Sequence, residues 1–429
     1  MTFQNTPEFA QQLDAQDELK NYRSEFIFPQ HEGKDVIYFT GNSLGLQPKR
    51  TKKYVDDVMS DWANLAVEGH FYAEKPWWDY HERFANPLSK LVGAKPSEVT
   101  VMNTLTVNLH LLMVSFYRPT KTRYKIICEE KAFPSDQYMF QSQVDFHSRN
   151  FGINKEDALV EIKRRDGEHN IRLEDVLAKI REVGDELALV LLGGVNYYTG
   201  QVFDMKAITE AGHKVGAIVG FDLAHAAGNI KLDLHDWKVD FAAWCSYKYM
   251  NSGPGNASGC FIHEKHHHAN LPQFAGWWGH NKERRFKMEP TFDPVQGADG
   301  WQISNLPILS LAPYLASVEL FAEVGMDKLI QKRNQITAYL EFILREIDKE
   351  IDGTEFEIIT PSNQEERACQ LSVLLHGQGR SLFDYLMKNG VVTDWREPNV
   401  IRFAPAPFYC SYEDMYNFGQ ILKKGILKG

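Results

Sequence analysis

The segments Asp222-Leu223-Ala224-His225 and Ser246-Tyr247-Lys248 each follow a short apolar run of the chain. The first run is Ala217–Phe221, and the second is Phe241–Cys245. Brief, continuous apolar runs of this kind are typical of strands that are buried on both faces of a sheet. Because open α/β folds bind ligands at the carboxyl ends of their parallel strands, both segments are expected at one edge of such a sheet.

An acid, a histidine and a lysine at one sheet edge suit a pyridoxal 5'-phosphate cofactor. The amine of Lys248 can form a Schiff base with the cofactor, and the carboxylate of Asp222 can keep the pyridine nitrogen protonated. An exposed lysine and an exposed aspartate after two buried strands explain these two segments equally well. The neighbouring segments decide between the two interpretations.

Further apolar runs alternate with amphipathic segments between Pro96 and Ile262. These runs are Tyr124–Cys128, Leu187–Leu192, Ala217–Phe221, Phe241–Cys245 and Gly259–Ile262. Helical segments between buried strands predict βαβ crossovers. The expected fold is therefore α/β, with a mostly parallel central sheet flanked by helices.

The rest of the chain predicts a smaller α+β domain, built from the C-terminal part and an N-terminal arm. The arm includes a strand at Val36–Phe39, and a helical stretch, Ile308–Ile351, is interrupted near Gly325. Beyond it we expect strands at Glu355–Ile359, Gln370–Leu375 and Val400–Ala404, and helices at Ser381–Lys388 and Tyr412–Leu422. The predicted division is 1–60 for the arm and part of the small domain, 61–307 for the large cofactor-binding domain, and 308–429 for the small domain.

The composition is that of a soluble globular protein, with 43% hydrophobic and 24% charged residues among 429. A net charge of −10 argues against nucleic acid or an anionic membrane surface as a partner. No apolar run reaches the ~18 residues of a membrane span, and Met1–Arg23 lacks the apolar segment of a signal peptide. The five cysteines contain no CxxC pair, so a reducing cytoplasm is the expected compartment.

Two polar clusters are predicted to face solvent. His263, His266, His267 and His268 would point in different directions on a helix and have no evident carboxylate partner, so no metal site is expected. The stretch Lys282-Glu283-Arg284-Arg285 is the second such cluster. The nearby pair Trp277-Trp278 could be core, could wall an aromatic substrate, or could lie in an interface.

Three further segments could contact a flat, phosphorylated ligand, although each also has a plain structural explanation. Asn103-Thr104-Leu105-Thr106 opens a helix whose free N–H groups attract phosphate, or it simply caps a core helix. Phe133-Pro134-Ser135-Asp136 offers a stacking ring and an acid, or merely starts a helix. Gly193-Gly194 lets the backbone approach a ligand closely, or makes a tight turn.

Taken together, these segments resemble the kynureninase family, pyridoxal phosphate enzymes of fold type I in the aspartate aminotransferase superfamily. The resemblance extends from Tyr38–Pro48 to Arg402 through the motifs NTLTVNLH, FPSD, YYTGQ, DLAHAAG, CSYKYMNSGPG and GWWGH. It implies hydrolysis of L-kynurenine or 3-hydroxy-L-kynurenine to anthranilate or 3-hydroxyanthranilate plus L-alanine. It also implies a cytoplasmic homodimer with sites at the subunit interface, serving tryptophan catabolism or NAD biosynthesis.

The resemblance implies roles for single positions. It makes Lys248 the Schiff-base lysine, Asp222 the partner of the pyridinium nitrogen, and Tyr247 a phosphate contact and candidate proton relay. The other cofactor contacts implied are Leu105, Thr106, Phe133, Pro134, Ser135, Asp136, Gly193 and His225, with Trp277 and Asn305 supplied by the neighbouring subunit. Some relatives have serine at the position of Gly193.

The resemblance also implies a set of substrate contacts: Ser43, His70, Ser304, Asn305 and Arg402. Arg402 resembles the arginine that holds the substrate α-carboxylate, and a planar guanidinium suits a carboxylate bidentately. His70 with Ser304-Asn305 resembles the set found in members that favour 3-hydroxykynurenine.

Two other functions are compatible with the same fold. A cysteine desulfurase or selenocysteine lyase would need a nucleophilic cysteine on a mobile loop, and Cys369 is the only candidate. A non-catalytic protein of this fold would bind an aromatic ligand or a partner surface. The presence of Lys248, Asp222 and Arg402 together argues against such a binder, because binding alone requires no Schiff base.

Overall fold

The computed structural model describes residues 2–351, 356–377 and 379–428. Its largest sheet has seven strands in the order β6-β12-β11-β10-β9-β7-β8. The strands are β6 Val99–Met102, β7 Lys125–Glu129, β8 Leu159–Ile162, β9 Leu187–Gly193, β10 Ile218–Asp222, β11 Phe241–Trp244 and β12 Ser258–Ile262. Strands β8, β7, β9, β10 and β11 pair in parallel, whereas β12 pairs antiparallel with both β11 and β6. The predicted mostly parallel sheet is therefore confirmed.

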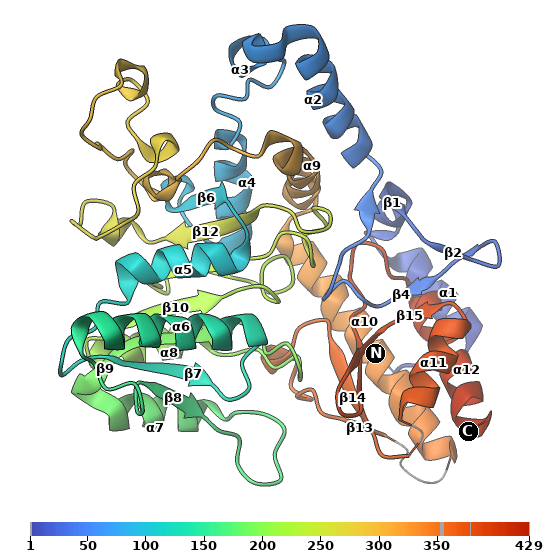
Figure 1. Ribbon diagram of the computed structural model, residues 1–429. Helices are drawn as coiled ribbons and strands as arrows, with labels where there is room; N and C mark the ends of the chain where they lie inside the picture. The colour runs from blue at the N-terminus through green and yellow to red at the C-terminus, as the bar shows by residue number, and fades with distance from the viewer. Residues whose placement is uncertain (1, 352–355, 378, 429) are drawn as a thin grey trace.

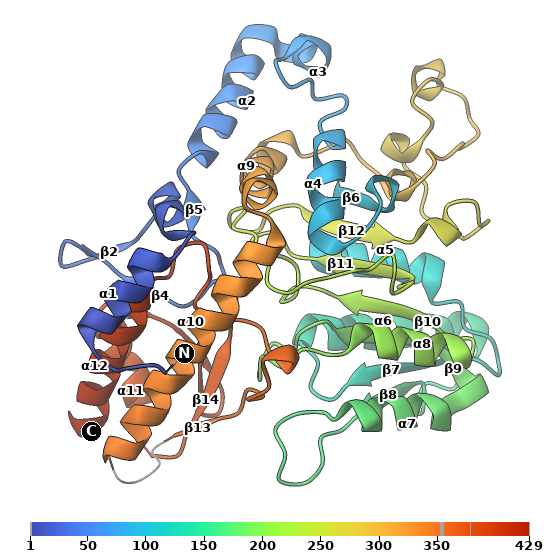
Figure 2. The same cartoon turned by 180° about the vertical axis from the view of Figure 1, so that it is seen from behind.

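Helices cover both faces of this sheet (Figures 1 and 2). Helices α5 Leu105–Phe116 and α6 Pro134–Phe151 lie on one face, and α4 Glu82–Val92, α7 Leu173–Val183 and α8 Met205–Lys214 lie on the other. Alternate residues of β9 enter two different cores, since Leu189 and Leu191 pack with the first group and Val190 and Leu192 with the second. This alternation explains why the strand reads as a continuous apolar run.

A smaller antiparallel sheet has the strand order β13-β14-β17-β16. Its strands are β13 Phe356–Ile358, β14 Leu371–Leu375, β16 Asp394–Arg396 and β17 Val400–Phe403, and its helices are α10 Met326–Ile351, α11 Arg380–Lys388 and α12 Tyr412–Lys428. The predicted C-terminal elements are confirmed to within a few residues, although α12 is longer than expected and Glu355 lies outside the described residues.

The N-terminal segment completes the smaller unit. Helix α1 Pro7–Gln16 packs against α12, and β4 Ile37–Tyr38 pairs in parallel with β15 Val391–Val392. The remaining short strands form the pairs β1 Phe26–Ile27 with β5 Gln47–Pro48, and β2 Gln30–His31 with β3 Lys34–Asp35. Helix α2 Thr51–Leu65 packs against α9 Ile308–Val324 and leads to the short helix α3 Gly69–Tyr72 at its outer end (Figures 1 and 2). The division at residues 60 and 307 stays a prediction.

Helix α9 Ile308–Val324 and helix α10 meet at Gly325, which has a φ of +81°. The break confirms the interruption predicted near Gly325. The two helices form an angle of 83°, and only together do they reach the length and apolar character of a membrane span. No single helix in the described residues does so.

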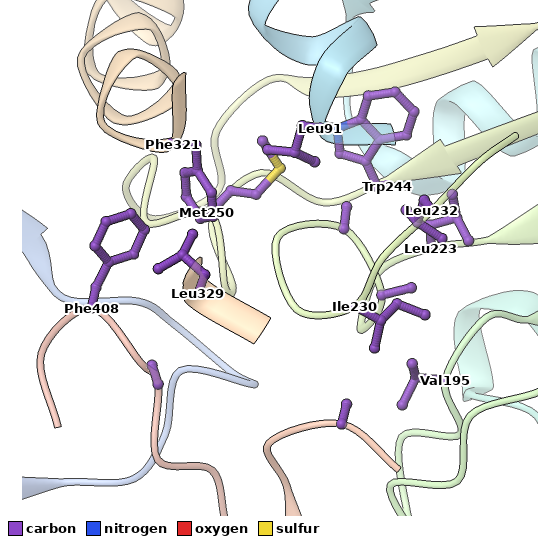
Figure 3. Packing of buried hydrophobic residues seen from close by; sticks show 14 of the residues in the cluster. Leu91, Val195, Leu223, Ile230, Leu232, Trp244, Met250, Phe321, Leu329 and Phe408 are labelled. Carbon is purple, nitrogen blue, oxygen red and sulfur yellow. The ribbon is translucent and has the colours of Figure 1, made fainter. Parts of the chain in front are cut away.

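The hydrophobic core between the large sheet and helices α4, α7 and α8 continues into the smaller unit. Figure 3 shows Met250, Phe321 and Phe408 leading away from Trp244 of β11. The rings of Phe321 in α9 and Phe408 after β17 lie 4.8 Å apart at an angle of 84°. Full burial of each such side chain contributes about 1.5–3 kcal/mol, so this row of contacts ties the two units together.

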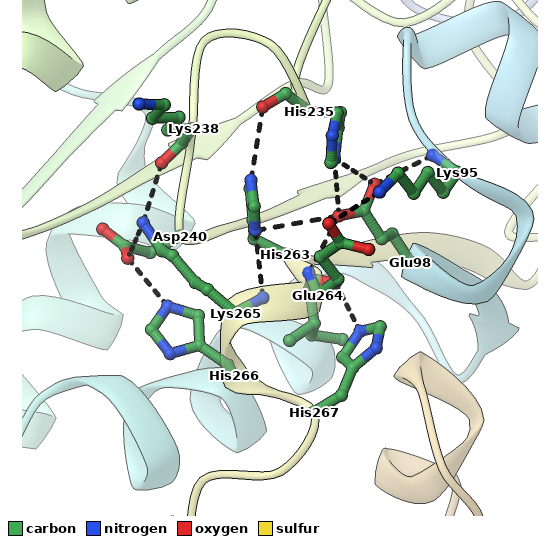
Figure 4. A network of polar contacts seen from close by, with 11 residues as sticks. Lys95, Glu98, His235, Lys238, Asp240, His263, Glu264, Lys265, His266 and His267 are labelled. Carbon is green, nitrogen blue, oxygen red and sulfur yellow. Dashed lines mark hydrogen bonds and ion pairs between the residues drawn. The ribbon is translucent and has the colours of Figure 1, made fainter.

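The histidine run after β12 does not form the predicted solvent-facing surface. His263 is buried, and Nε2 of His266 lies 2.8 Å from Oδ1 of the buried Asp240. His235 and the buried Glu98 join the same network, with Nδ1 of His235 2.9 Å from Oε1 of Glu98 (Figure 4). The prediction was wrong because both carboxylates are distant in sequence and reach the histidines only through pairing of β6, β12 and β11.

Glu98, His235 and His263 each place one potential metal-ligand atom within 4.8 Å of the others. These atoms already have partners inside the protein. The carboxylate of Glu98 accepts hydrogen bonds from the backbone N–H groups of Lys95 and Glu264, and Nδ1 of His263 accepts one from Lys265. The cluster therefore acts as a structural link between loops.

The prediction that Lys282-Glu283-Arg284-Arg285 faces solvent was wrong for Arg285. Its side chain is buried, with Cζ 4.7 Å from the ring centroid of Trp78 and 4.6 Å from that of Trp278. The guanidinium lies over both indole rings, and the negative faces of the rings stabilise the cation. Trp278 is thus a core residue, whereas Trp277 is 40% exposed.

Candidate active site

A cavity of about 290 Å³ opens at the carboxyl ends of β7, β9, β10 and β11. The predicted site residues that line it are Ser43, Leu105, Thr106, Phe133, Ser135, Asp136, Gly193, Asp222, His225, Tyr247 and Lys248. A larger cavity of about 1220 Å³ is lined by none of the predicted site residues. The chemistry is therefore concentrated in the smaller cavity.

Asp222 ends β10 and is buried at the base of this cavity. Its Oδ1 accepts a hydrogen bond of 2.7 Å from the backbone N–H of Ala224, and its cross-strand partner in β9 is Gly193. Burial raises the pKa of Asp222, and the charge of Lys248 opposes that rise. A cation placed against this carboxylate would keep it ionised.

Lys248 lies in the loop after β11, with Nζ 5.7 Å from the ring centroid of Phe133. The backbone N–H of Gly45 donates a 2.9 Å hydrogen bond to the carbonyl of Tyr247. A Cβ on Gly45 would lie 2.5 Å from the carbonyl oxygen of Lys248. Only glycine allows this approach, so the N-terminal turn holds the lysine loop in place.

The N-terminus of α5 faces the cavity through Leu105 and Thr106. The N-cap residue Thr104 makes no side-chain capping hydrogen bond. The first N–H groups of a helix lack partners within the helix, and the helix dipole favours an anion beside them. This end of the cavity therefore suits a phosphate.

Phe133 and Asp136 reach the cavity from the start of α6, where the ring of Phe133 lies 5.2 Å from that of Tyr197 in a T-shaped contact. Within the described residues, Oδ1 of Asp136 and Nδ1 of His225 are buried without a hydrogen-bonding partner. Burial, and then the charge of Asp222, raise the pKa of Asp136 well above its ordinary value. Burial lowers the pKa of His225 well below its ordinary value, so the imidazole is neutral.

These groups fit pyridoxal phosphate. The cavity brings together an amine, a buried carboxylate, an aromatic ring, a helix N-terminus and two buried polar atoms without partners. A buried polar atom without a partner costs about 1–3 kcal/mol, so a polar ligand that satisfied such atoms would be stabilised here.

Arg402 lies behind the cavity wall and does not line it. Its side chain is 1% exposed, and Nη2 lies 3.3 Å from Oγ of the lining residue Ser43. Pro134 begins α6 and also does not line the cavity.

Four further predicted residues do not line the cavity of their own chain: His70, Trp277, Ser304 and Asn305. Ser304 and Asn305 are exposed, and Nδ1 of His70 lies 3.0 Å from the carbonyl oxygen of Val67. Trp277 donates a 3.1 Å hydrogen bond from Nε1 to the carbonyl of Arg285.

Comparison with known proteins gives relatives that match the whole chain. The chain is 86% identical over 429 residues to a kynureninase of Flavobacterium psychrophilum, covering 100% of each sequence. It is 51% identical over 420 residues to a kynureninase of Koribacter versatilis, covering 97% of each. The chain belongs to the kynureninase family. A family model described as the kynureninase C-terminal domain also matches residues 330–422.

Solved structures show the same fold for this kynureninase-family chain at low identity. A cysteine desulfurase from Thermococcus onnurineus NA1 has a TM-score of 0.72 and 17% identity, covering 92% of this chain and 95% of its own. A mutant of C-DES with glycine covalently linked to its pyridoxal phosphate cofactor has a TM-score of 0.75 and 17% identity, covering 90% and 96%. The predicted fold type I is thereby confirmed.

Sequence reasoning missed several residues of this kynureninase-family site, including Glu129, Tyr197 and Arg396, which line the cavity. Glu129 ends β7, the strand predicted at Tyr124–Cys128, so the strand-end argument used for Asp222 could have found it. Its Oε2 accepts a 3.1 Å hydrogen bond from Asn196. Burial raises the pKa of Glu129 to about 7, the hydrogen bond from Asn196 opposes this, and the charge of Asp222 adds to it.

Proposed function

We propose that this protein binds pyridoxal 5'-phosphate through Lys248 and hydrolyses the Cβ–Cγ bond of kynurenine or 3-hydroxykynurenine. The products are L-alanine and anthranilate or 3-hydroxyanthranilate. The observation that carries the proposal is that Lys248, Asp222 and the first turn of α5 line one cavity in a chain of the kynureninase family.

The cofactor would be held by three elements of the large sheet. Lys248 would bind it covalently, Asp222 would face its ring nitrogen, and Leu105 and Thr106 at the start of α5 would receive its phosphate. When bound, pyridoxal phosphate acts as an electron sink for the pair of electrons left at the substrate α-carbon.

Lys248 and Asp222 would divide the first part of the reaction between them. Nζ of Lys248, when it is not bound to the cofactor, would accept the α-proton of the substrate and hold it. Asp222 would stay ionised beside a bound cation and so support the electron sink. A positioned general base typically raises the reaction rate ~10²- to 10⁴-fold, and Lys248 combines this role with the covalent link to the cofactor.

Tyr247 is the proposed proton donor of the later steps. Its side chain lines the cavity, and burial raises the pKa of the phenol, so Oη carries its proton at neutral pH. Water would supply the hydroxyl of the aromatic acid that leaves, and the Tyr247 hydroxyl would relay a proton to the β-carbon of the fragment that becomes alanine.

A desulfurase-like reaction is disfavoured by the position of Cys369. The residue is fully buried just before β14 and packs with Tyr249 and Ala404. Burial raises the pKa of its thiol to about 12, although a hydrogen bond with Tyr249 opposes the rise. A nucleophilic cysteine should be an accessible thiolate, and Cys369 is neither accessible nor ionised.

We also propose a homodimer in which each subunit lends Trp277 and Asn305 to the other. An exposed apolar patch supports this arrangement, since the ring of Phe71 contacts those of Tyr72 and Phe286 and the three residues are each more than 50% exposed. An apolar surface of this kind marks an interaction site. The ring of His70 contacts Phe71 and that of Trp277 contacts Phe286, which supports the proposed role of this surface in pairing with a second subunit.

The compartment and the preferred substrate are further parts of the proposal. All five cysteines are free and buried, which supports a reducing cytoplasm. The resemblance at His70 and Ser304-Asn305 supports a preference for 3-hydroxykynurenine over kynurenine.

The test is to incubate the purified protein, loaded with pyridoxal phosphate, with each kynurenine separately. We expect L-alanine and the matching anthranilate in equal amounts, with faster turnover of the 3-hydroxy substrate. If the visible absorbance shifts on adding substrate but no product forms, the protein would be a binding protein and not an enzyme. Release of sulfur from free cysteine would favour a desulfurase, provided that the Cys369→Ser variant no longer releases it.

A further inference from the structure

Glu129 is a buried acid that no cation in the described residues neutralises. It ends β7, is 4% exposed and lines the smaller cavity. Oε2 accepts a 3.1 Å hydrogen bond from Nδ2 of Asn196, and no other hydrogen bond to this carboxyl occurs in the described part of the chain. A Cβ on Gly193 would lie 3.2 Å from Oε1, so glycine there leaves the carboxyl its position. Burying such a carboxyl costs stability, and its single hydrogen bond points to Asn196 as the residue through which it acts.

The amide of Asn196 has one orientation that satisfies its surroundings. Its Oδ1 accepts hydrogen bonds from the backbone N–H of Tyr198 at 3.0 Å, the backbone N–H of Thr199 at 2.9 Å and Oγ1 of Thr199 at 3.2 Å. The backbone carbonyl of Asn196 also accepts a 2.9 Å hydrogen bond from Gly200. Because the oxygen end of the amide is engaged by the loop, the NH₂ end is directed to Glu129. Asn196 therefore connects the loop after β9 to the end of β7.

The loop that Asn196 organises carries Tyr197 at the cavity wall. Tyr197 lines the cavity, and its ring lies 5.2 Å from that of Phe133 at an angle of 84°. The smaller unit also holds this loop, since Nε2 of Gln370 donates a 3.1 Å hydrogen bond to the carbonyl of Tyr197. The hydrogen bond between Asn196 and Glu129 ties the same loop to the large sheet.

We propose that Glu129 and Asn196 are positioning residues that fix the ring of Tyr197 against Phe133, the ring expected to stack on the bound cofactor. Asn196 sets the path of the loop, and Glu129 fixes the amide of Asn196 by accepting its N–H. This role of Glu129 needs one acceptor oxygen and no charge, so a protonated carboxyl or an amide can fulfil it equally well. The inference deepens the proposed function and rests on it for the identity of the ligand.

The test compares Glu129→Leu, which keeps the approximate size of the side chain but lacks an acceptor, with Glu129→Gln, which keeps the acceptor. Titration of each cofactor-free protein with pyridoxal phosphate, followed by visible absorbance, gives the dissociation constant. We expect Glu129→Leu to raise this constant ~10-fold, because the hydrogen bond that fixes the loop is lost, and Glu129→Gln to stay within about twofold of the wild type. Glu161→Leu, exposed on β8, is the control and should match the wild type.

Urea unfolding of the same cofactor-free variants separates positioning from a general loss of structure. Removal of a buried carboxyl should leave Glu129→Leu about as stable as the wild type, so weaker cofactor binding would not reflect unfolding. The visible circular dichroism of the bound cofactor should change in Glu129→Leu and not in Glu129→Gln, because this signal depends on the rings around the cofactor. A Glu129→Gln variant that binds as weakly as Glu129→Leu would overturn the proposal, and so would unchanged binding by Glu129→Leu.

A double-mutant cycle tests whether Glu129 acts through Tyr197. We expect Tyr197→Ala alone to raise the dissociation constant ~10-fold. The double variant with Glu129→Leu should raise it by about the same factor, because both changes disturb the same ring. Independent effects would multiply to ~100-fold, and that result would contradict the proposal.

Cofactor binding is measured without turnover, so failure of the reaction and failure of this inference can be told apart. A wild-type protein that binds pyridoxal phosphate but forms no alanine would refute the proposed hydrolysis alone. Normal wild-type turnover with an unchanged dissociation constant in Glu129→Leu would refute the inference alone. Absence of cofactor binding by the wild type would overturn both.

Discussion

At the scale of single residues, Lys248 carries the sharpest expectation. Lys248→Ala removes both the covalent attachment of the cofactor and the proposed base, so turnover should fall by more than ~10⁴-fold. The visible absorbance of the lysine-bound cofactor should disappear at the same time. Lys179→Ala, on the surface of α7, serves as the control. Turnover by Lys248→Ala close to that of the wild type would refute the assignment.

The raised pKa of Glu129 leads us to expect that the stability of the cofactor-free protein depends on pH. Its pKa in the folded protein is raised to about 7, compared with an ordinary value of 4.5. Stability from this group is fully present below pH 4.5 and is lost as the pH rises to about 7, because the unfolded chain releases the proton first.

Glu129→Gln should remove this loss. The variant should gain up to about 3 kcal/mol in free energy of unfolding relative to the wild type between pH 5 and pH 8. Urea unfolding across this range measures the gain, and Glu161→Gln in β8, which faces outward, is the matched control. A difference between variant and wild type that does not change with pH would show that Glu129 is ionised throughout.

Residue types and strand ends predicted most of the cavity lining, since Lys248, Asp222 and Gly193 follow recognisable apolar runs. Arg396 could not be found in this way. It reaches the cavity from β16 of the smaller sheet, which no local pattern in the sequence indicates. Glu129 could have been found, because it directly follows a predicted strand.

At the scale of elements, Asp240 joins parts of the large sheet that are distant in sequence. Its Oδ2 accepts a 2.7 Å hydrogen bond from the N–H of Val219 in β10 and lies 2.8 Å from Nε2 of His213 in α8. Its Oδ1 lies 2.8 Å from Nε2 of His266 and 2.7 Å from Nζ of Lys265. Burial would raise the pKa of Asp240, but these partners together hold it well below its ordinary value.

Asp240→Asn should therefore destabilise the protein at neutral pH by roughly 1.5–3 kcal/mol, because the buried carboxylate loses charge-assisted contacts with Val219, His213, His266 and Lys265. The contribution of Asp240 is present above the ordinary pKa of 3.8 and is lost only as the pH falls further. Urea unfolding at pH 7 gives the difference, with Asp236→Asn as the surface control. Equal midpoints for Asp240→Asn and the wild type would contradict the structural role.

The elements themselves were largely predictable. Buried strands such as β9 read as continuous apolar runs, and the break between α9 and α10 was signalled by Gly325. The antiparallel direction of β12 was not predictable, because a buried strand reads the same in either direction. The histidine network was missed for the related reason that its carboxylates come from other loops.

At the scale of the whole molecule, the proposed dimer can be tested by complementation. Lys248→Ala and Trp277→Ala should each be impaired as homodimers. In a hybrid, one site would combine the intact Lys248 of one subunit with the intact Trp277 of the other. Co-expression in equal amounts should restore about 25% of wild-type turnover, since half of the dimers are hybrids with one intact site.

The complementation assay needs two controls. Light scattering should give twice the mass of the chain, which is 49.3 kDa. Mixing Lys248→Ala with Asp222→Asn, two changes within the same cavity, should restore no turnover beyond that of the separate proteins. No recovery in the first mixture would show that Trp277 serves its own subunit, and recovery in the second would contradict the placement of Lys248 and Asp222 in one cavity.

The pairing of β4 with β15 joins Ile37 and Val391, residues separated by roughly 350 positions of the chain. During synthesis at ~5–20 residues per second, β4 leaves the ribosome roughly 20 to 70 seconds before its partner strand exists. Over that interval the arm has an unpaired edge that could bind other chains. A trigger-factor-like chaperone that shields nascent chains should therefore raise the soluble yield of this protein more than that of a variant with charged residues placed on the edge of β4.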